Sequence, residues 1–209
     1  MDTSPAPATI VSVNLGTPQQ VDWIRSGRTA IDRRPVTGPV AVGPLGLAGD
    51  EVANRRFHGG PDKAVYAFAQ EQLEYWQEVL DHPFPPGSFG ENLTTRGLAV
   101  DEAVIGERWR LGEGPGAAVV EVASFRTPCR VFQAWLAHRG APSRAWVRRF
   151  TQHARPGAYL RVITPGPVAA GDAVSIVHRP GGTAGGATIA STFRAAHGLP
   201  AHDDPMLPG

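Results

Sequence analysis

The sequence predicts a mostly β domain of the α+β class, built as a barrel or sandwich with a few helices. Short apolar runs recur along the chain and are closed by glycine or proline, which is typical of strands joined by turns. The 209 residues include 25 glycines and 20 prolines, as expected for a chain with many turns. The length suits one domain with a full core and short extensions.

The composition excludes several functional classes. The formal net charge is +1, with 20 basic and 19 acidic residues, so no whole-molecule field indicates nucleic acid or a membrane surface as a partner. A single cysteine excludes an internal disulfide, and no apolar run approaches the roughly 20 residues of a membrane span. The first ten residues lack the features of a secretory signal, so we expect a cytoplasmic protein.

The domain is expected to cover residues 9–179. Residues 1–8 are predicted to form a flexible tail, because they are polar and rich in proline and alanine. Residues 180–209 are predicted to be a glycine-rich linker and a short helical appendage.

Periodicity places the elements in order. The first strand is expected at 9–15, and further strand signals lie at 28–32 and 39–42. A buried strand over 64–69 leads into a helix over 70–80, in which Leu73, Trp76 and Leu80 share one face. The remaining predicted elements are a hairpin of 104–111 with 117–123, helices over 131–137 and 142–154, strands over 157–163 and 172–178, and a short helix over 188–197.

Cys129 is the first candidate site residue. It lies between Arg126 and Arg130, and guanidinium groups favour a thiolate over a thiol, as a metal ligand or nucleophile requires. It also falls between a predicted strand and a predicted helix, where sites are often built. The alternative is that Cys129 is a small buried apolar residue.

A second candidate is the loop of residues 55–63, which gathers Arg55, Arg56, His58, Gly59, Gly60, Asp62 and Lys63. Paired glycines let backbone N–H groups approach a ligand, and the cations could hold a phosphate or carboxylate. The alternative is a solvated polar turn. The segment 90–95 adds Asn92, whose amide could recognise a heteroaromatic ring or close a turn.

Four ordered motifs together resemble the MOSC domain, and within it the YiiM-like branch. They are His58-Gly-Gly-Pro-Asp-Lys-Ala-Val65, Gly90-Glu-Asn-Leu-Thr-Thr95, Arg126-Thr-Pro-Cys129, and Tyr159-x-Arg161 followed by Gly171-Asp172. The resemblance spans residues 9–179. It implies a closed, mostly antiparallel β-barrel with a few flanking helices. It also implies a small C-terminal helical unit, for which this chain has room for about one short helix.

The resemblance implies a reductase that contains the molybdenum cofactor (molybdopterin). Cys129 matches the position of the molybdenum ligand, and the substrates are N-hydroxylated compounds such as hydroxylaminopurines and amidoximes, which are reduced to amines. In this scheme Arg126 and Arg130 stabilise the thiolate or bind the anionic cofactor. Lys63, with Arg55 or Arg56, holds the pterin phosphate, while Asn92 contacts the pterin or an oxo ligand. His58 or Asp62 is the candidate proton donor.

Partners and rival functions complete the hypothesis. The sequence has no dinucleotide-binding fingerprint and no cysteine cluster, so a separate flavin or iron–sulfur protein is expected to supply electrons. A homodimer is plausible. The first rival function is a sulfur carrier with a persulfide on Cys129, and the second is an anion-binding module without catalysis.

Overall fold

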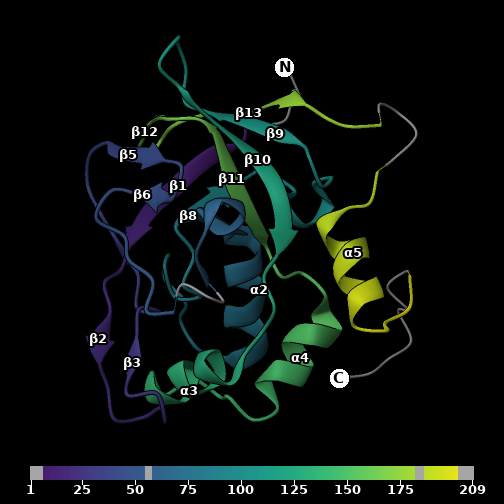
Figure 1. Ribbon diagram of the computed structural model, residues 1–209. Helices are drawn as coiled ribbons and strands as arrows, with labels where there is room; N and C mark the ends of the chain where they lie inside the picture. The colour runs from purple at the N-terminus through teal and green to yellow at the C-terminus, as the bar shows by residue number, and fades with distance from the viewer. Residues whose placement is uncertain (1–6, 55–57, 182–185, 202–209) are drawn as a thin grey trace, which may run out of the picture.

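The computed structural model describes residues 7–54, 58–181 and 186–201, and the statements below concern those residues (Figure 1). An eight-stranded sheet has the order β13-β9-β10-β11-β7-β8-β1-β4. Its strands are β1 (Thr9–Leu15), β4 (Arg34–Pro35), β7 (Val65–Ala69), β8 (Leu93–Arg96), β9 (Arg108–Leu111), β10 (Ala118–Phe125), β11 (Ala158–Thr164) and β13 (Val174–His178).

Smaller elements surround this sheet. A three-stranded sheet joins β12 (Gly166–Val168), β5 (Val40–Gly43) and β6 (Gly46–Leu47), and a two-stranded sheet joins β2 (Gln19–Gln20) and β3 (Arg28–Thr29). The helices are α2 (Gln70–Leu80), α3 (Arg130–His138), α4 (Trp146–His153) and α5 (Ile189–Ala196), with 3₁₀ turns η1 (Pro61–Lys63) and η2 (Val100–Glu102). Within the described residues, no helix is both long and apolar enough to cross a membrane.

The prediction of a closed barrel is wrong, whereas an α+β fold with flanking helices is confirmed. The large sheet has two free ends, β13 and β4, and is accompanied by two separate sheets. β1 meets the β13 side only through an isolated bridge between Thr9 and Ala173 and three nearby backbone hydrogen bonds. The end of β1 pairs instead with β4, a strand of two residues whose Pro35 has no N–H with which to extend a ladder.

Most elements lie where periodicity predicts them. β1 and α2 have the predicted boundaries, and Leu73, Trp76 and Leu80 are buried on one face of α2. The hairpin prediction is also confirmed, because β9 and β10 pair antiparallel. The parallel pairing of β7 with β8 was not predicted. It depends on α2, which supplies the crossover that a parallel pair requires.

Two apolar cores lie on opposite faces of β7 and β11. Aliphatic residues such as Val65, Ala67 and Leu160 belong to a core inside the curved sheet. The alternate residues Tyr66 and Tyr159 belong to an aromatic core with α2, α3 and α4. Side chains of a strand point alternately to its two faces, so the same two strands build both cores. Figure 1 shows α3 and α4 below the sheet, on the side of the aromatic core.

The predicted division into tail, domain and appendage stays a prediction, and much of both extensions lies outside the described residues. The described part of the last segment packs on the sheet. Ile189 of α5 is fully buried in the aliphatic core, and its N–H donates to the carbonyl of Ala103. The ring of Phe193 lies 5.2 Å from that of Phe125.

Candidate functional site

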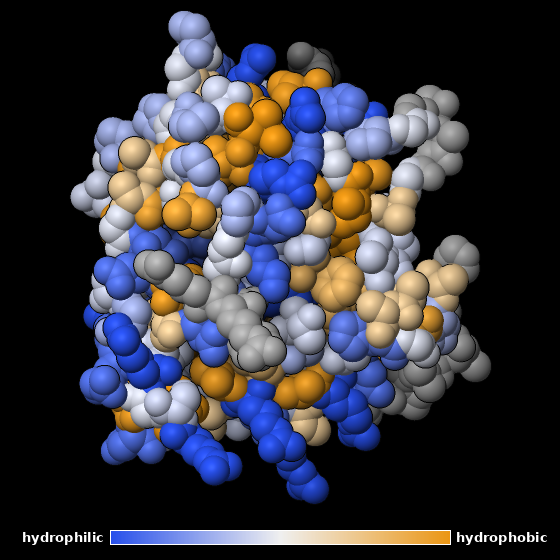
Figure 2. All heavy atoms as spheres, viewed as in Figure 1, coloured by the Kyte–Doolittle hydropathy of each residue, from blue (hydrophilic) through white to orange (hydrophobic). Residues whose placement is uncertain are grey.

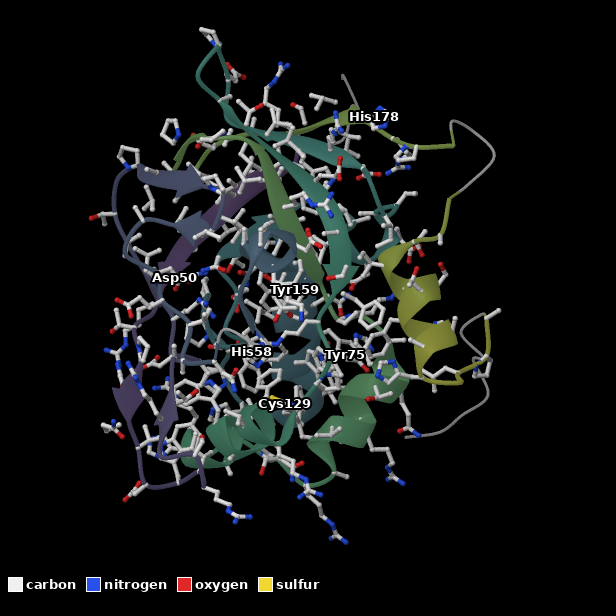
Figure 3. The ribbon with its side chains drawn as sticks, in the orientation of Figure 1. Asp50, His58, Tyr75, Cys129, Tyr159 and His178 are labelled. Atoms are coloured by element: carbon white, nitrogen blue, oxygen red, sulfur yellow. The ribbon has the colours of Figure 1, made fainter. Side chains whose placement is uncertain are left out.

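A cavity of about 1650 Å³ opens beside the aromatic core. Its walls come from segments that are far apart in the sequence, mainly 26–33, 41–54, 58–66 and 125–131, together with Gly90, Asn92 and Tyr159. Ligand pockets are typically about 300–1,000 Å³, so this cavity can hold a ligand as large as a pterin cofactor together with a small substrate. Figure 3 shows Tyr159, His58 and Cys129 following one another down the middle of the molecule, with Asp50 to one side.

Cys129 lies at the predicted strand-to-helix turn. β10 ends at Phe125, and α3 begins at Arg130 with Cys129 as its N-cap residue, in an extended conformation. The thiol side chain is half-buried, lines the cavity and packs against the aromatic core. The turn therefore presents one thiol to a large cavity.

Arg126 is a buried cation beside this thiol. Its side chain is about 5% exposed, its Nη1 donates to the carbonyl of Phe89 at 2.9 Å, and its guanidinium lies over the rings of Tyr66 and Phe132. Burial lowers the pKa of Arg126, but the negative charges that Tyr159, Tyr66 and Cys129 can carry raise it more, and the net shift is upward. Arg126 is therefore a fixed positive charge.

One polar atom of Arg126 has no partner. Its Nε is buried and makes no hydrogen bond, although buried donors are normally satisfied. The residue lines the cavity, so an anionic ligand could supply the missing acceptor. A soft sulfur ligand and a buried guanidinium whose Nε lacks an acceptor suit an anionic cofactor that carries a soft metal. The residues present therefore fit the molybdenum cofactor. Among the described residues, no group of three or more His, Cys, Asp or Glu side chains could hold a metal ion.

Gly90 leaves the space that Arg126 occupies. Its φ is +72°, and a Cβ there would lie 3.2 Å from Nη1 of Arg126 and 3.2 Å from Cγ1 of Ile31. The preceding loop is held by Glu91, a fully buried carboxylate that accepts from the N–H groups of Gly87 and Phe89. Burial raises the pKa of Glu91.

The described part of the 55–63 loop brings His58 to the cavity. His58 Nδ1 lies 3.2 Å from the hydroxyl of Tyr159, and Nζ of Lys63 lies 5.7 Å from the centre of the Tyr159 ring. Burial, followed by the charges of Arg126, Lys63 and Arg33, lowers the pKa of His58 to about 4. His58 is therefore neutral at neutral pH, and any proton it donates comes from a neutral imidazole.

The predicted site residues divide into three groups. Those that line the cavity are His58, Gly59, Gly60, Lys63, Asn92, Arg126 and Cys129. Asp62 and Arg130 are exposed and do not line it. Asp62 instead forms an ion pair with Nε of Arg161 at 2.8 Å. Arg55 and Arg56 lie outside the described residues. The functional assignment of all of these residues stays a prediction.

Asn92 has a structural role in addition to its place in the wall. Its Oδ1 accepts from the N–H of Tyr66 and its Nδ2 donates to the carbonyl of Asn14. The side chain thus ties the β8 segment to both β7 and β1. The amide NH₂ carries two hydrogens, so these two hydrogen bonds leave one of them unused.

Several residues of the cavity wall were not predicted as site residues. Tyr66 and Tyr159 face each other in the β7–β11 register, and strand alternation could have placed each on the face opposite its aliphatic neighbours. Arg33 makes a two-point ion pair with Asp50 and donates to the carbonyl of Gly90 at 2.7 Å. No local pattern marks Arg33, because its partners are distant in the sequence.

Comparisons with known proteins identify a family that this chain matches. The model of the MOSC domain family matches residues 54–175. The uncharacterized protein YflK of Bacillus subtilis is 34% identical over 171 residues, which cover 81% of this chain and 73% of YflK. A protein from Gibberella moniliformis named a reductase is 29% identical over 187 residues, or 86% of this chain but 31% of that protein. This chain thus spans less than a third of that reductase.

A solved structure shares the fold. The crystal structure of YiiM from Geobacillus stearothermophilus matches with a TM-score of 0.69 and 31% sequence identity, covering 91% of this chain and 84% of that chain.

Proposed function

Because the chain belongs to the MOSC domain family, we propose that it is a molybdenum-cofactor-dependent reductase that converts N-hydroxylated compounds into amines. The MOSC domain is associated with this cofactor, and one distant relative is named a reductase. The observation that carries the proposal is that one cavity is lined by the Cys129 thiol and by the buried Arg126, whose Nε makes no hydrogen bond. Hydroxylaminopurines and amidoximes are the proposed substrate classes.

Different residues of the chain are proposed to bind different parts of the cofactor. Cys129 would be the metal ligand, with the positive charge of Arg126 beside it. Lys63 would bind an anionic end of the cofactor through a charge-assisted hydrogen bond. When bound, the cofactor supplies the two electrons of the reduction. Overall, R–NHOH takes up two electrons and two protons and gives R–NH₂ and water. An amidoxime, with the same balance, gives the amidine and water.

His58 and Tyr159 are the proposed route for protons. The hydroxyl of Tyr159 can donate to Nδ1 of the neutral His58 ring, which leaves the ring hydrogen on Nε2. A protonated His58 is disfavoured by burial and by three nearby cations. Both members of the pair can therefore donate a proton from a neutral group. Neither of them adds a positive charge to a cavity that already contains cations.

The test is the molybdenum and pterin content of protein expressed in cells that make the cofactor. We expect near-stoichiometric molybdenum in the wild type and a loss of at least tenfold in Cys129→Ser. Ser124→Ala is the matched control, because it also changes one atom near the end of β10 and should retain the metal. Wild-type protein without molybdenum or pterin would overturn the proposal, and sulfane sulfur on Cys129 would then favour a sulfur carrier.

A further inference from the structure

The segment that carries Cys129 is unusually basic. No aspartate or glutamate occurs between Glu121 and Asp172, although the whole chain contains 19 acidic residues. The same interval holds Arg126, Arg130, Arg139, Arg144, Arg148, Arg149, Arg155 and Arg161. The formal net charge of the chain is only +1, so the remaining residues carry an excess of acid. Positive charge is thus concentrated in one part of the molecule.

Five of these arginines form a surface that we call the basic end: Arg130, Arg139, Arg144, Arg148 and Arg149. They lie on α3, on α4 and on the connection between the two helices. All but the half-buried Arg149 are exposed. Figure 2 shows extended hydrophilic side chains projecting from the lower edge of the molecule, where Figure 1 places these two helices.

The basic end lacks the ion pairs found elsewhere. None of its five arginines forms a salt bridge with a residue that the structure describes. Four arginines on the main sheet do so: Arg34 with Asp32, Arg96 with Glu74, Arg108 with Glu121, and Arg161 with Asp62 and Glu121. Arg179, directly after β13, also pairs with Glu107. Like charges gathered without partners repel one another and destabilise the folded state. An external anionic partner would relieve this repulsion.

The basic end adjoins the candidate site. Arg130 directly follows Cys129, and α3 then runs about 14 Å away from it at 1.5 Å per residue. α4 packs on α3 through Phe132 and Trp146, whose ring centres lie 5.2 Å apart. Arg28, another exposed arginine, lines the cavity from the β3 side. A partner bound to the basic end would therefore lie near the thiol.

Nearby acidic groups do not neutralise this surface. On α2, Glu74 pairs with Arg96 and Glu71 accepts from the N–H of Gly97, so both are directed to the β8 side. Other exposed acidic residues are Glu78 on α2, Asp81 at the C-terminal end of α2, Asp22, and Glu51 in the cavity wall. None of these acidic residues forms a salt bridge with the basic end within the described residues.

We propose that the basic end is the docking surface for a small acidic electron-transfer protein that delivers electrons to the site at Cys129. This inference rests on the proposed function, since each substrate reduced consumes two electrons. The single cysteine of the chain cannot hold an iron–sulfur cluster, so the electrons come from outside. Electron-transfer complexes have small interfaces and depend on complementary charge. A long nucleic acid fits less well, because it would also meet the acidic remainder of the surface.

The experiment measures binding of two acidic probes, a flavodoxin and a [2Fe–2S] ferredoxin, by calorimetry on the purified full chain. We expect at least one probe to bind the wild type at 50 mM NaCl and to lose at least tenfold in affinity at 500 mM. Arg148→Glu should weaken binding at least tenfold at 50 mM NaCl. The matched control is Arg110→Glu, which makes the same charge change on β9, at the opposite end of the molecule in Figure 1. It should change affinity less than twofold.

Three results would overturn the docking proposal: no binding of either probe to the wild type, equal weakening by Arg148→Glu and Arg110→Glu, or tighter binding of a 20-nucleotide single-stranded DNA that depends on Arg148. A separate assay of cofactor-loaded protein uses dithionite-reduced methyl viologen, which needs no docking surface. If the wild type reduces neither a hydroxylaminopurine nor an amidoxime with viologen, the proposed function is wrong, while the binding data still decide the docking surface.

Discussion

The two faces of β7 and β11 differ in what they bury. On one face Val65, Ala67 and Leu160 are fully buried in an aliphatic core. On the other face Tyr66 and Tyr159 lie in an aromatic core beside the cavity. Alternate residues of the same strands thus serve two purposes. The aliphatic face provides a rigid support, and the aromatic face, held by that support, positions the candidate site.

Buried charged groups also lie on the aromatic side. The aromatic side contains a buried cation, Arg126, and a buried carboxylate, Glu91, as well as the partly buried His58. Burying such groups costs free energy unless they are paired or hydrogen-bonded. The aromatic side tolerates this cost because backbone groups and aromatic rings surround the charges. A comparison of mutations on the two faces can therefore separate stability from function.

The largest effect on stability is expected on the aliphatic face. Leu160→Ala should lower the free energy of unfolding by about 2–5 kcal/mol, because it leaves a cavity in a closed core. Urea unfolding monitored by circular dichroism measures this change. A loss below about 1 kcal/mol would show that the aliphatic face does not provide the rigid support.

The second effect is a dependence of stability on pH that arises on the aromatic side. The pKa of His58 is about 4 in the folded protein, so between pH 6.5 and 4 the unfolded chain binds a proton that the folded protein does not. The free energy of unfolding that results from this difference is fully present above pH 6.5. It falls by about 3 kcal/mol as the pH is lowered to 4. Urea unfolding at pH 7 and pH 4 measures this effect. Between these two pH values, the free energy of unfolding should fall less in His58→Gln than in the wild type.

Asp101 provides the opposing control for this prediction. Burial raises its pKa to about 6, so the folded state binds the extra proton between pH 6 and 4, and stability rises as the pH falls. Asp101→Asn should therefore steepen the loss of stability on acidification, whereas His58→Gln should reduce it. Equal pH profiles in the wild type and His58→Gln would contradict the assignment of a neutral His58.

A third, smaller effect concerns the space around Arg126. Gly90→Ala should destabilise the fold by about 1–2 kcal/mol, because a positive φ is unfavourable for alanine. Gly140→Ala is the matched control, with φ +78° and no atom within 4 Å of the added Cβ. Both variants carry the backbone strain, but only the Cβ of Gly90→Ala lies against the guanidinium, at 3.2 Å from Nη1 of Arg126. We expect iodoacetamide to alkylate Cys129 more slowly in Gly90→Ala than in Gly140→Ala. Equal alkylation rates in the two variants would contradict this expectation.

The smallest effect on stability is expected for Tyr159→Phe, beside Leu160 in sequence but on the opposite face. Loss of one hydroxyl should cost about 1 kcal/mol or less. Nitrogen-15 chemical shifts of the His58 ring should nevertheless change, because Nδ1 loses its donor and the tautomers mix. This measurement needs no bound cofactor. An unchanged His58 spectrum would show that Tyr159 does not fix the tautomer.

Local patterns predicted much of the fold. The apolar spacing of 70–80 was enough to place α2, and the run Thr9–Leu15 was enough to place β1, because both signals act over a few residues. The barrel prediction failed because closure depends on which strands meet at the two ends of the sheet. That outcome depends on two-residue strands such as β4, which carry almost no local signal.

The sequence by itself determined the order of the main elements, the single thiol at the start of α3, and the acid-free basic segment around it. Tertiary structure alone decided that Arg126 is buried with an unsatisfied Nε, that Tyr159 reaches His58, and that Asp62 pairs with Arg161 outside the cavity. The physical reason is the range of the interactions. Helix periodicity and turn chemistry act between neighbours, whereas a cavity wall is assembled by contacts between residues as distant in sequence as 58 and 159.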